Sequence, residues 1–269
     1  MPERDWITFL TDYGTADGFV GICHGVMARI APQARVLDLT HLVPPGDIGH
    51  GAEALRQAIA YLPEAVHLAV VDPGVGTSRR PVVLSAGGHL LVGPDNGLLV
   101  RAADEVGGVD SAHELSEPRY ALGAVSHTFH GRDIFAPAAA HLATGLAPGE
   151  LGPEVPVADL VRLPEPIARR EGEEIHGEIV FADRFGNLQS SLPADLVAQS
   201  GLSVGTRLEV TAKGSTVTLP FVTTFADVAE GEPLAHVDSA DRLALAVNRG
   251  SAATALDLGE GDRFTLRAR

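Results

Sequence analysis

The stretch that decides the fold begins at Val66 and ends at Arg80, and it reads VHLAVVDPGVGTSRR. Its first six residues are mostly apolar, which predicts a central strand buried on both faces of a sheet. The proline and two glycines that follow favour a turn in which the backbone can approach a ligand closely. Open α/β sheets bind ligands beyond the carboxyl ends of their strands, so we interpret this turn as an active-site loop carrying Asp72 and Arg79. The alternative is an ordinary turn in which these two residues form an ion pair.

Strand and helix patterns alternate on both sides of this stretch. Apolar residues recur at helical spacing in several segments, with short apolar runs between them. We predict strands at 6–10, 35–39, 66–71, 81–86 and 89–92, and helices at 19–30, 48–62 and 132–142. This alternation is typical of a mainly parallel sheet covered by helices, so the predicted fold class of this half is α/β.

The pattern changes after a segment rich in proline and charge at about 148–174, which we interpret as a linker. Beyond it, apolar and polar residues alternate in short segments separated by turns. We predict strands there at 175–181, 207–211, 216–221, 234–237, 243–247 and 263–267. Such strands favour a small all-β barrel or sandwich. We therefore predict an α/β N-terminal domain over 1–165 and a β-barrel C-terminal domain over 175–269.

Composition argues against several classes of protein. The 269 residues carry a formal net charge of −15 without a basic patch, so we expect no binding to nucleic acid or to an anionic membrane surface. Cys23 is the only cysteine, so we expect neither an intrachain disulfide nor a cysteine metal cluster within one chain. No apolar run approaches the roughly 20 residues that span a bilayer, and the first residues have no signal-peptide pattern. We expect a soluble, cytoplasmic protein.

Three further polar clusters fall where loops are expected. Asp12 follows the first strand, where a carboxylate can accept hydrogen bonds from a ribose diol, whereas we interpret Asp17 as a helix cap. Residues 128–133 precede a helix and offer an imidazole, an aromatic face and a charged pair. Residues 183–187 read DRFGN and lie in the β domain, where on their own they are also consistent with a plain turn.

Taken together, these clusters resemble one family, the S-adenosylmethionine hydroxide adenosyltransferases, which are hydrolases related to fluorinase and chlorinase. The resemblance covers nearly the whole chain, and its motifs occur in order across both predicted domains. They are the segments 9–17, 38–41, 71–80, 93–97, 129–133, 183–187 and 224–228, together with Asn248. The resemblance implies an α/β N-terminal domain, a β-barrel C-terminal domain and a homotrimer. In that trimer, substrate lies between the N-terminal domain of one subunit and the C-terminal domain of its neighbour.

The resemblance also implies which residues bind S-adenosylmethionine. In the first domain, Asp12 is expected to bind the ribose hydroxyls and Phe129 to wall the reacting carbon, and Asn96 lies within a matching motif. In the second domain, one group is expected to hold the methionine end of the substrate and another the adenine. The groups are Asp183, Asn187 and Ser239 for methionine and Phe225, Ala240 and Arg249 for adenine, with Phe185 in the same motif as Asp183.

By the same resemblance, the hydrolases carry an Asp–Arg–His set that maps onto Asp72, Arg79 and His130. The halogenating relatives have a tyrosine at the first of these positions and lack the histidine, which favours water as the nucleophile here. Fluorinase also carries a long insertion, and a tryptophan where this chain has Gly46. Gly131 matches the small residue of the chlorinating relative, so halide chemistry stays open as an alternative.

The implied reaction is displacement at the 5′ carbon of the ribose, with the sulfonium leaving as methionine. The enzyme must hold a water in line behind that carbon and make it nucleophilic. Arg79 can stabilise a developing hydroxide, and His130 or Asp72 can accept the proton. Our hypothesis is that His130 and Asp72 share the role of base.

Two other classes of function stay open at this point. His127, His130, Asp133 and His141 offer ligands for a metal-dependent hydrolase, although no known motif has their spacing. A non-catalytic sensor of adenosine or S-adenosylmethionine is the second. Under the main interpretation, S-adenosylmethionine is the substrate, adenosine and L-methionine are the products, water is the co-substrate, and neither a cofactor nor a metal is expected.

Overall fold

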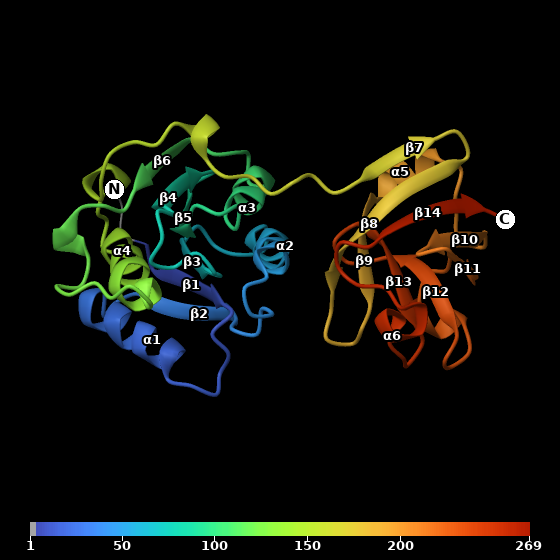
Figure 1. The fold of residues 1–269 in the computed structure, drawn as a ribbon, viewed down its shortest axis with the longest axis horizontal. Helices are drawn as coiled ribbons and strands as arrows, with labels where there is room; N and C mark the ends of the chain where they lie inside the picture. The colour runs from blue at the N-terminus through green and yellow to red at the C-terminus, as the bar shows by residue number, and fades with distance from the viewer. Residues whose placement is uncertain (1–3) are drawn as a thin grey trace. The chain divides into compact units, whose positions relative to one another are not determined.

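The computed structural model describes residues 4–269 and divides the chain into two compact units, with the division between Leu163 and Pro164 (Figure 1). Residues 1–3 belong to the N-terminal stretch on which we predict no signal peptide, and they lie outside the described residues. Within the described chain, none of the helices combines the length and the apolar character that a membrane crossing requires.

A six-stranded sheet forms the centre of the N-terminal unit. Its strands lie in the order β2 (Arg35–Thr40), β1 (Trp6–Thr11), β3 (Val66–Val70), β5 (His89–Pro94), β4 (Pro81–Ala86) and β6 (Ser111–Glu114). The first four strands pair in parallel, whereas β4 and β6 pair antiparallel, so the sheet is mixed. The reversal comes from the turn between β4 and β5, where Gly87 and Gly88 both have positive φ and allow a tight hairpin.

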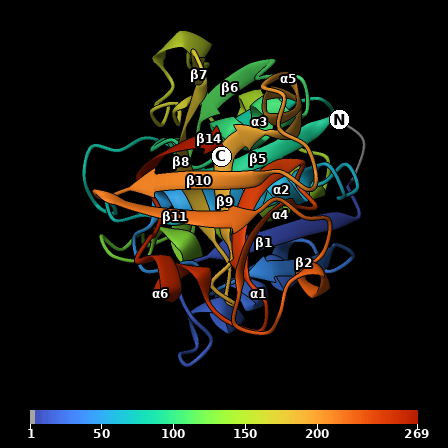
Figure 2. The same cartoon turned by 90° about the vertical axis from the view of Figure 1, so that its right-hand side faces the viewer.

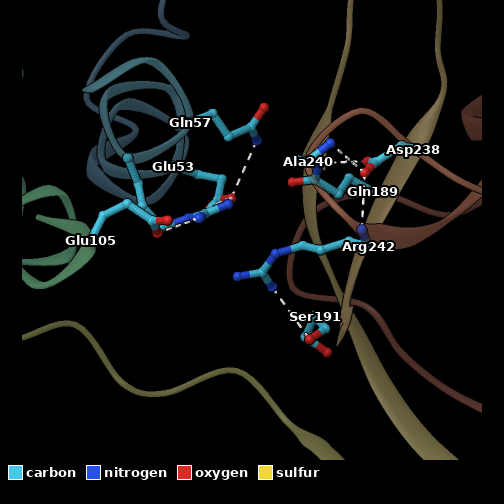
Figure 3. Close-up of polar contacts among 9 residues, drawn as sticks. Glu53, Gln57, Glu105, Gln189, Ser191, Asp238, Ala240 and Arg242 are labelled. Atoms are coloured by element: carbon cyan, nitrogen blue, oxygen red, sulfur yellow. Dashed lines mark hydrogen bonds and ion pairs between the residues drawn. The ribbon is translucent and has the colours of Figure 1, made fainter. Parts of the chain in front are cut away.

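Helices cover both faces of this sheet (Figure 1). On one face, α1 (Phe19–Ile30) and α4 (Ala136–Ala143) share a hydrophobic core with β1 and β3; on the other lie α2 (Ile48–Ile59) and α3 (Val100–Glu105). Arg56 ties α2 to α3, because its Nη1 donates to Glu105 at 2.7 Å while its Nε donates to the buried Glu53 at 3.0 Å. Figure 3 shows both glutamates of this cluster.

The helix predicted at 132–142 begins as a π-helix over Gly131–Phe135 and continues as α4. Pro137 has no N–H and cannot donate to the carbonyl of Asp133 one turn earlier. The backbone N–H of Leu122 donates to that carbonyl instead, at 2.9 Å. Pro137 thus leaves this carbonyl free for Leu122 at the wide first turn of the predicted helix.

The topology of the sheet brings two polar loops together. The chain leaves β1 for β2 on one side and later returns to β3 on the other, so β1 and β3 are parallel neighbours, with Thr11 opposite Val70. Asp12 follows β1 and Asp72 follows β3, so both carboxylates lie at the same edge of the sheet. Such a switch in strand order is where open α/β sheets form their ligand sites.

The C-terminal unit is built around an antiparallel sheet that nearly closes into a barrel (Figures 1 and 2). Its strands lie in the order β11 (Ser215–Pro220), β10 (Arg207–Ala212), β14 (Arg263–Ala268), β8 (Glu174–Ala182), β9 (Leu188–Pro193), β13 (Arg242–Val247) and β12 (Pro233–Val237), with β7 (Ala168–Glu171) beside β8. A parallel bridge between Phe221 and Ala235 brings the two ends of the sheet together. Figure 2 shows β10 and β11 side by side as one hairpin.

Several elements were not predicted from the sequence. They are α3, β6, β7, β9, the short helices α5 (Ala194–Gln199) and α6 (Ala252–Leu256), and single turns at Pro118–Tyr120, Pro148–Glu150, Val157–Asp159 and Phe225–Asp227. Strand β9 escapes detection because Gln189, Ser190 and Ser191 are buried polar residues, so it lacks the usual alternation. Part of the proline-rich segment packs on the N-terminal unit, where the backbone N of Val155 donates to Ala112 at 2.8 Å.

Candidate active site

A pocket of about 190 Å³ opens in the N-terminal unit at the carboxyl ends of β1 and β3. Asp12 and Asp72 line it from the two strand ends, and Phe129, His130 and Gly131 line it from the loop before the π-helix. Its other lining residues are Tyr13, Phe19, Val70, Val75 and Thr128. The structure therefore gathers the motif residues of three separate segments around one cavity.

Asp72, Arg79 and His130 form a hydrogen-bonded set beside this pocket. Arg79 Nε donates to Asp72 Oδ1 at 3.1 Å, and Arg79 Nη2 pairs with Asp72 Oδ2. The same Nη2 lies 3.1 Å from Nδ1 of His130. The Asp72 and Arg79 side chains are only 6% and 8% exposed, so their ion pair is shielded from screening by solvent. The ion pair allowed by the sequence is thus present, and it is part of a larger set.

The hydrogen bond with Arg79 determines which ring nitrogen of His130 carries the proton. A guanidinium group only donates hydrogen bonds, so Nδ1 of His130 accepts from Arg79 and the ring proton sits on Nε2. Burial, followed by the charge of Arg79, lowers the pKa of His130 below its ordinary value. The imidazole is therefore neutral at pH 7, with Nε2 as a hydrogen-bond donor.

Arg79 keeps one nitrogen without a partner. Its Nη1 is buried and makes no hydrogen bond to any described residue. Cζ of Arg79 lies 5.2 Å from the ring centroid of Phe135, so the guanidinium also packs over this ring. Because a buried unpaired donor costs roughly 1–3 kcal/mol, this Nη1 is best explained as a group kept for a ligand.

A side-chain hydrogen bond and a glycine hold the loop after β3. Asn96 Nδ2 donates to the carbonyl of Val71 at 2.9 Å, so Asn96 anchors the end of the strand and does not line the pocket. Gly76 has φ +78°, and a Cβ there would lie 2.3 Å from the carbonyl oxygen of His127. Glycine is therefore required where this loop crosses the loop that carries His130.

The loop carrying His130 is anchored by a buried carboxylate. Asp133 is fully buried and accepts from the backbone N of Ser126 at 2.8 Å and from Arg132 Nε at 2.6 Å. Burial alone would raise the pKa of Asp133, but these hydrogen bonds outweigh it and lower the pKa. Asp133 thus stays ionised and positions the loop without facing the pocket.

At the first strand, Asp12 Oδ2 accepts from the backbone N of Gly46 at 2.8 Å. Tyr13, which we did not single out from the sequence, packs edge-on against Phe129 with ring centroids 5.8 Å apart. The capping role predicted for Asp17 is wrong, because α1 begins after Gly18 and no side chain caps it.

In the C-terminal unit, Asp183, Phe185 and Asn187 lie in one tight loop between β8 and β9. Asp183 Oδ1 accepts from the backbone N of Phe185 at 2.8 Å and of Asn187 at 2.9 Å, and Oδ2 accepts from Asn187 Nδ2 at 2.7 Å. The Phe185 side chain is largely exposed. The loop is therefore a pre-organised turn that presents a carboxylate with fixed orientation.

Strand directions place Arg249 and Phe225 near this loop. Strands β8 and β13 both flank β9 antiparallel, and Leu188 pairs with Ala182 on one side and with Leu245 on the other. Arg249 follows β13 at this end of the barrel. The segment after Phe225 is tied to the same end, because Asn248 Nδ2 donates to the carbonyl of Val228 at 2.9 Å.

Ser239 and Ala240 lie in the turn that follows β12. They form the turn between β12 and β13, where Arg242 pairs with Pro193 at the far end of β9. Figure 3 shows this turn: the backbone N of Ala240 donates to Asp238 at 2.9 Å. Asp238 Oδ2 also accepts from Nε2 of Gln189 at 2.5 Å, so this turn is tied to the strand that leaves the loop of Asp183, and the roles expected for Ser239 and Ala240 stay predictions.

Ser251 also lies beside the loop of Asp183. It caps α6, its Oγ accepting from the backbone N of Thr254 at 3.2 Å, and a Cβ on Gly186 would lie 2.1 Å from this Oγ. The backbone N of Ala253 donates to the carbonyl of Gly186 at 3.0 Å. The Ser-x-x-Thr capping pattern at 251–254 is the sequence signal that could have identified this segment.

The structure does not assemble the metal-hydrolase alternative. Among residues 4–269, ligand atoms of three or more His, Cys, Asp or Glu side chains converge within 4.8 Å at His24, Asp38 and His41. The residues proposed as ligands of a metal-dependent hydrolase, namely His127, His130, Asp133 and His141, do not form such a group within this part of the chain.

Comparison with known proteins gives a consistent picture. The chain matches the SAM hydroxide adenosyltransferase N-terminal domain over residues 7–152 and the C-terminal domain over residues 177–265. It is 51% identical to a protein of Salinispora tropica named (R)-S-adenosyl-L-methionine hydrolase, with 100% of both chains covered, and 29% identical to a fluorinase of Actinoplanes sp., with 97% and 96% covered. The crystal structure of an uncharacterized conserved protein from Thermotoga maritima superposes with a TM-score of 0.91 at 36% identity, covering 97% of this chain and 99% of that one.

Proposed function

The chain belongs to the SAM hydroxide adenosyltransferase family, and from this premise we propose that it hydrolyses S-adenosyl-L-methionine to adenosine and L-methionine. The relative named as a hydrolase is far more similar to this chain than the relative named as a fluorinase. The observation that carries the proposal is the buried, unpartnered Nη1 of Arg79 within the Asp72–Arg79–His130 set.

In the proposed mechanism, water attacks the 5′ carbon of the ribose in line with the departing sulfur. Arg79 Nη1 donates to the attacking oxygen and stabilises its developing negative charge. The new bond joins this oxygen to the 5′ carbon, and the carbon–sulfur bond breaks with its electron pair going to sulfur, which leaves as the neutral thioether of methionine. The proton of the water goes to the carboxylate of Asp72 and then to solvent.

The geometry changes the role that we assign to His130. With Nδ1 accepting from Arg79 and a proton on Nε2, His130 has no free lone pair to take a proton from water. We therefore propose that Asp72 alone is the base. His130 holds Arg79 in place, and its ring N–H donates to the backbone of Ser126.

Five further residues are proposed to bind substrate. Asp12 and Phe129 line the pocket and are suited to the ribose and the reacting carbon. Asp183 and Asn187 form a pre-organised polar turn suited to the methionine ammonium and carboxylate, and the ring of Phe225 is 41% exposed and available for stacking on adenine. We propose a homotrimer in which the C-terminal unit of a neighbouring chain completes each site.

Halide chemistry is the second candidate, because Gly131 matches the small residue of the chlorinating relative. A halide needs donors but no base, whereas here the carboxylate of Asp72 lines the pocket and would repel an anion. Water is the nucleophile that such a carboxylate favours. A sensor without catalysis would need neither the ion pair nor the spare donor on Arg79.

Mass spectrometry of products tests the proposal. The purified protein is incubated with S-adenosylmethionine in 18O-water with chloride present, and an Arg79→Ala variant is the control. We expect methionine and adenosine with 18O at the 5′ oxygen from the wild type only. A chlorinated nucleoside would make the chain a halogenase, and unconverted substrate that is nevertheless tightly bound would make it a sensor.

A further inference from the structure

We propose that His24, Asp38 and His41 form a zinc-binding site in the N-terminal unit, separate from the proposed active site. His24 lies on α1, Asp38 on β2, and His41 directly after β2. None of the three lines the pocket described above. Their spacing along the chain follows no known metal motif, so the site departs from the sequence-based expectation that no metal is bound.

The three ligand atoms already lie close to the separations that zinc requires. His24 Nε2 is 2.8 Å and His41 Nε2 is 3.1 Å from the same oxygen of Asp38, and all three atoms lie within 4.8 Å of one another. With bonds of 2.0–2.2 Å, the ligand atoms of a tetrahedral zinc ion lie about 3.3 Å apart. Small side-chain rotations therefore suffice to admit the ion, with a water as the fourth ligand.

The hydrogen bonds of His41 give an independent reason to expect a cation. His41 is 6% exposed, and its Nε2 is buried and makes no hydrogen bond of acceptable geometry, although Asp38 lies 3.1 Å away. Its Nδ1 lies 2.9 Å from the hydroxyl of Thr11. When Nδ1 donates to Thr11, the lone pair of Nε2 points toward the carboxylate, and a cation bound between them satisfies both groups.

The surroundings hold the ligands rigidly and leave an entry path. The ring of His41 packs edge-on against the buried Phe9 at 4.8 Å, and the ring of His24 lies 5.9 Å from Phe9. Phe9 is the register partner of Asp38 across the β1–β2 pair. The side chains of His24 and Asp38 are 35% and 41% exposed, so zinc and its water can enter from solvent.

Two imidazoles and one carboxylate select zinc over the hard cations. Calcium and magnesium prefer six or more oxygen ligands, whereas imidazole nitrogen suits zinc and its neighbours in the transition series. Cobalt binds similar sites and reports their geometry by its visible absorption.

Zinc binding to the full-length protein tests the proposal. Protein without a histidine tag is stripped with a chelator, dialysed and titrated with zinc chloride, and bound metal is counted by mass spectrometry. We expect one zinc per chain for the wild type and at least tenfold weaker binding for His24→Ala and Asp38→Asn. His176→Ala removes a histidine from the C-terminal unit and should bind zinc as the wild type does.

Two outcomes would overturn the proposal: a wild type that binds no zinc, or His24→Ala and Asp38→Asn that bind it as tightly as the wild type. Both substituted side chains are partly exposed, and circular dichroism checks that the variants fold. Cobalt in place of zinc should give the intense visible bands of a four-coordinate site in the wild type, and weak bands only in Asp38→Asn. None of these readouts depends on hydrolysis, so failure of this proposal and failure of the proposed function are distinguishable.

Discussion

Arg79 meets three demands in one side chain. Its Nε and Nη2 bind Asp72, its Nη2 also reaches His130, and its Nη1 stays free of any described partner. A lysine has a single ammonium and cannot reproduce this fork. The Asp72 and Arg79 side chains are buried, so the set is preformed before substrate binds.

If Nδ1 of His130 accepts from Arg79, His130 positions Arg79 and is not the base, and two substitutions of His130 distinguish these roles. In His130→Asn, the side-chain oxygen can accept from Arg79 as Nδ1 does, while the amide keeps a donor. We expect His130→Asn to retain roughly tenfold more kcat than His130→Ala. If His130 is the base, both variants should lose about a hundredfold or more alike, because neither side chain can take the proton.

The lowered pKa of His130 predicts the acid limb of the pH profile. The neutral form is the one that accepts from Arg79, and it is lost only when pH falls through a pKa below the ordinary value of about 6.5. We expect kcat/KM to hold at pH about 6.5 and to decline below it. A profile that already declines above pH 7 on the acid side would contradict the lowered pKa.

Gly131 is fixed by a neighbour. A Cβ there would lie 2.0 Å from the hydroxyl oxygen of Tyr13, and Tyr13 shares the pocket with it. We expect Gly131→Ala to lower both kcat and the melting temperature, with a cost in the range of about 1–3 kcal/mol for overpacking.

The matched control for Gly131→Ala is the double variant with Tyr13→Phe. Without the hydroxyl, the nearest atom to the added Cβ is the ring carbon at 3.0 Å, so the clash is partly relieved. The double variant should regain stability relative to Gly131→Ala, and melting curves of both and of Tyr13→Phe alone check this. Equal destabilisation with and without the hydroxyl would show that Tyr13 is not the cause.

At the scale of elements, a row of buried hydrogen bonds links the side chains of three neighbouring strands. Thr8 on β1 bonds to Nδ1 of His67 on β3 at 2.8 Å, and Nε2 of His67 bonds to Nδ1 of His89 on β5 at 2.8 Å. Burial, followed by the charges of His89 and Arg4, lowers the pKa of His67 to about 3. Each ring nitrogen has one partner, so the neutral imidazole is fully satisfied within the sheet.

Because His67 in this row has a lowered pKa, the stability of the N-terminal unit depends on pH. Between about 6.5 and about 3 the unfolded chain binds a proton at His67 that the folded chain does not, so the free energy of unfolding falls as pH falls. The slope from one such group is roughly 1.4 kcal/mol per pH unit. The lowered pKa of His89 acts in the same direction.

Urea unfolding followed by fluorescence checks this slope. Trp6 is the only tryptophan and lies on β1, so its emission reports on the N-terminal unit. We expect stability to fall between pH about 7 and about 5 in the wild type, and to fall less in His67→Gln, whose amide does not titrate. The same slope in both proteins would show that His67 does not cause it.

At the scale of the whole molecule, the candidate site residues are divided between two units. The residues proposed for catalysis and the aspartate proposed for ribose binding belong to the first unit, and the residues proposed for methionine and adenine belong to the second. If the proposed trimer shares its sites between chains, two inactive variants with substitutions in different units should restore activity when they are mixed.

Mixed trimers give a direct test of shared sites. Arg79→Ala inactivates the first unit and Asn187→Ala the second, so each variant alone should be nearly inactive. When the two variants are co-expressed in equal amounts and each site joins units from two chains, about a quarter of wild-type activity should return. Half of the sites have an intact first unit, and half of those also have an intact second unit. No recovery in confirmed mixed trimers would place the whole site within one chain. Light scattering shows whether three chains associate.

Local patterns in the sequence determined most of the strands and helices and the segments that carry the site. The run from Val66 to Asp72 is apolar and ends in a turn, so both the central strand and the loop of Arg79 could be predicted from it. The motif from Phe129 to Asp133 likewise marked the loop of His130. These signals work because periodicity and turn chemistry depend on residues that are close in the chain.

Only the tertiary structure decided which distant residues meet. Strand register around β9 decides which turns share an end of the barrel, since Leu188, next to the loop of Asp183, pairs with Ala182 on one side and with Leu245 on the other. The proton position on His130 depends on an arginine 51 residues earlier, and the convergence of His24, Asp38 and His41 depends on how α1 packs beside β2. Such contacts are fixed by register, strand order and burial, which a pattern read along one chain does not contain.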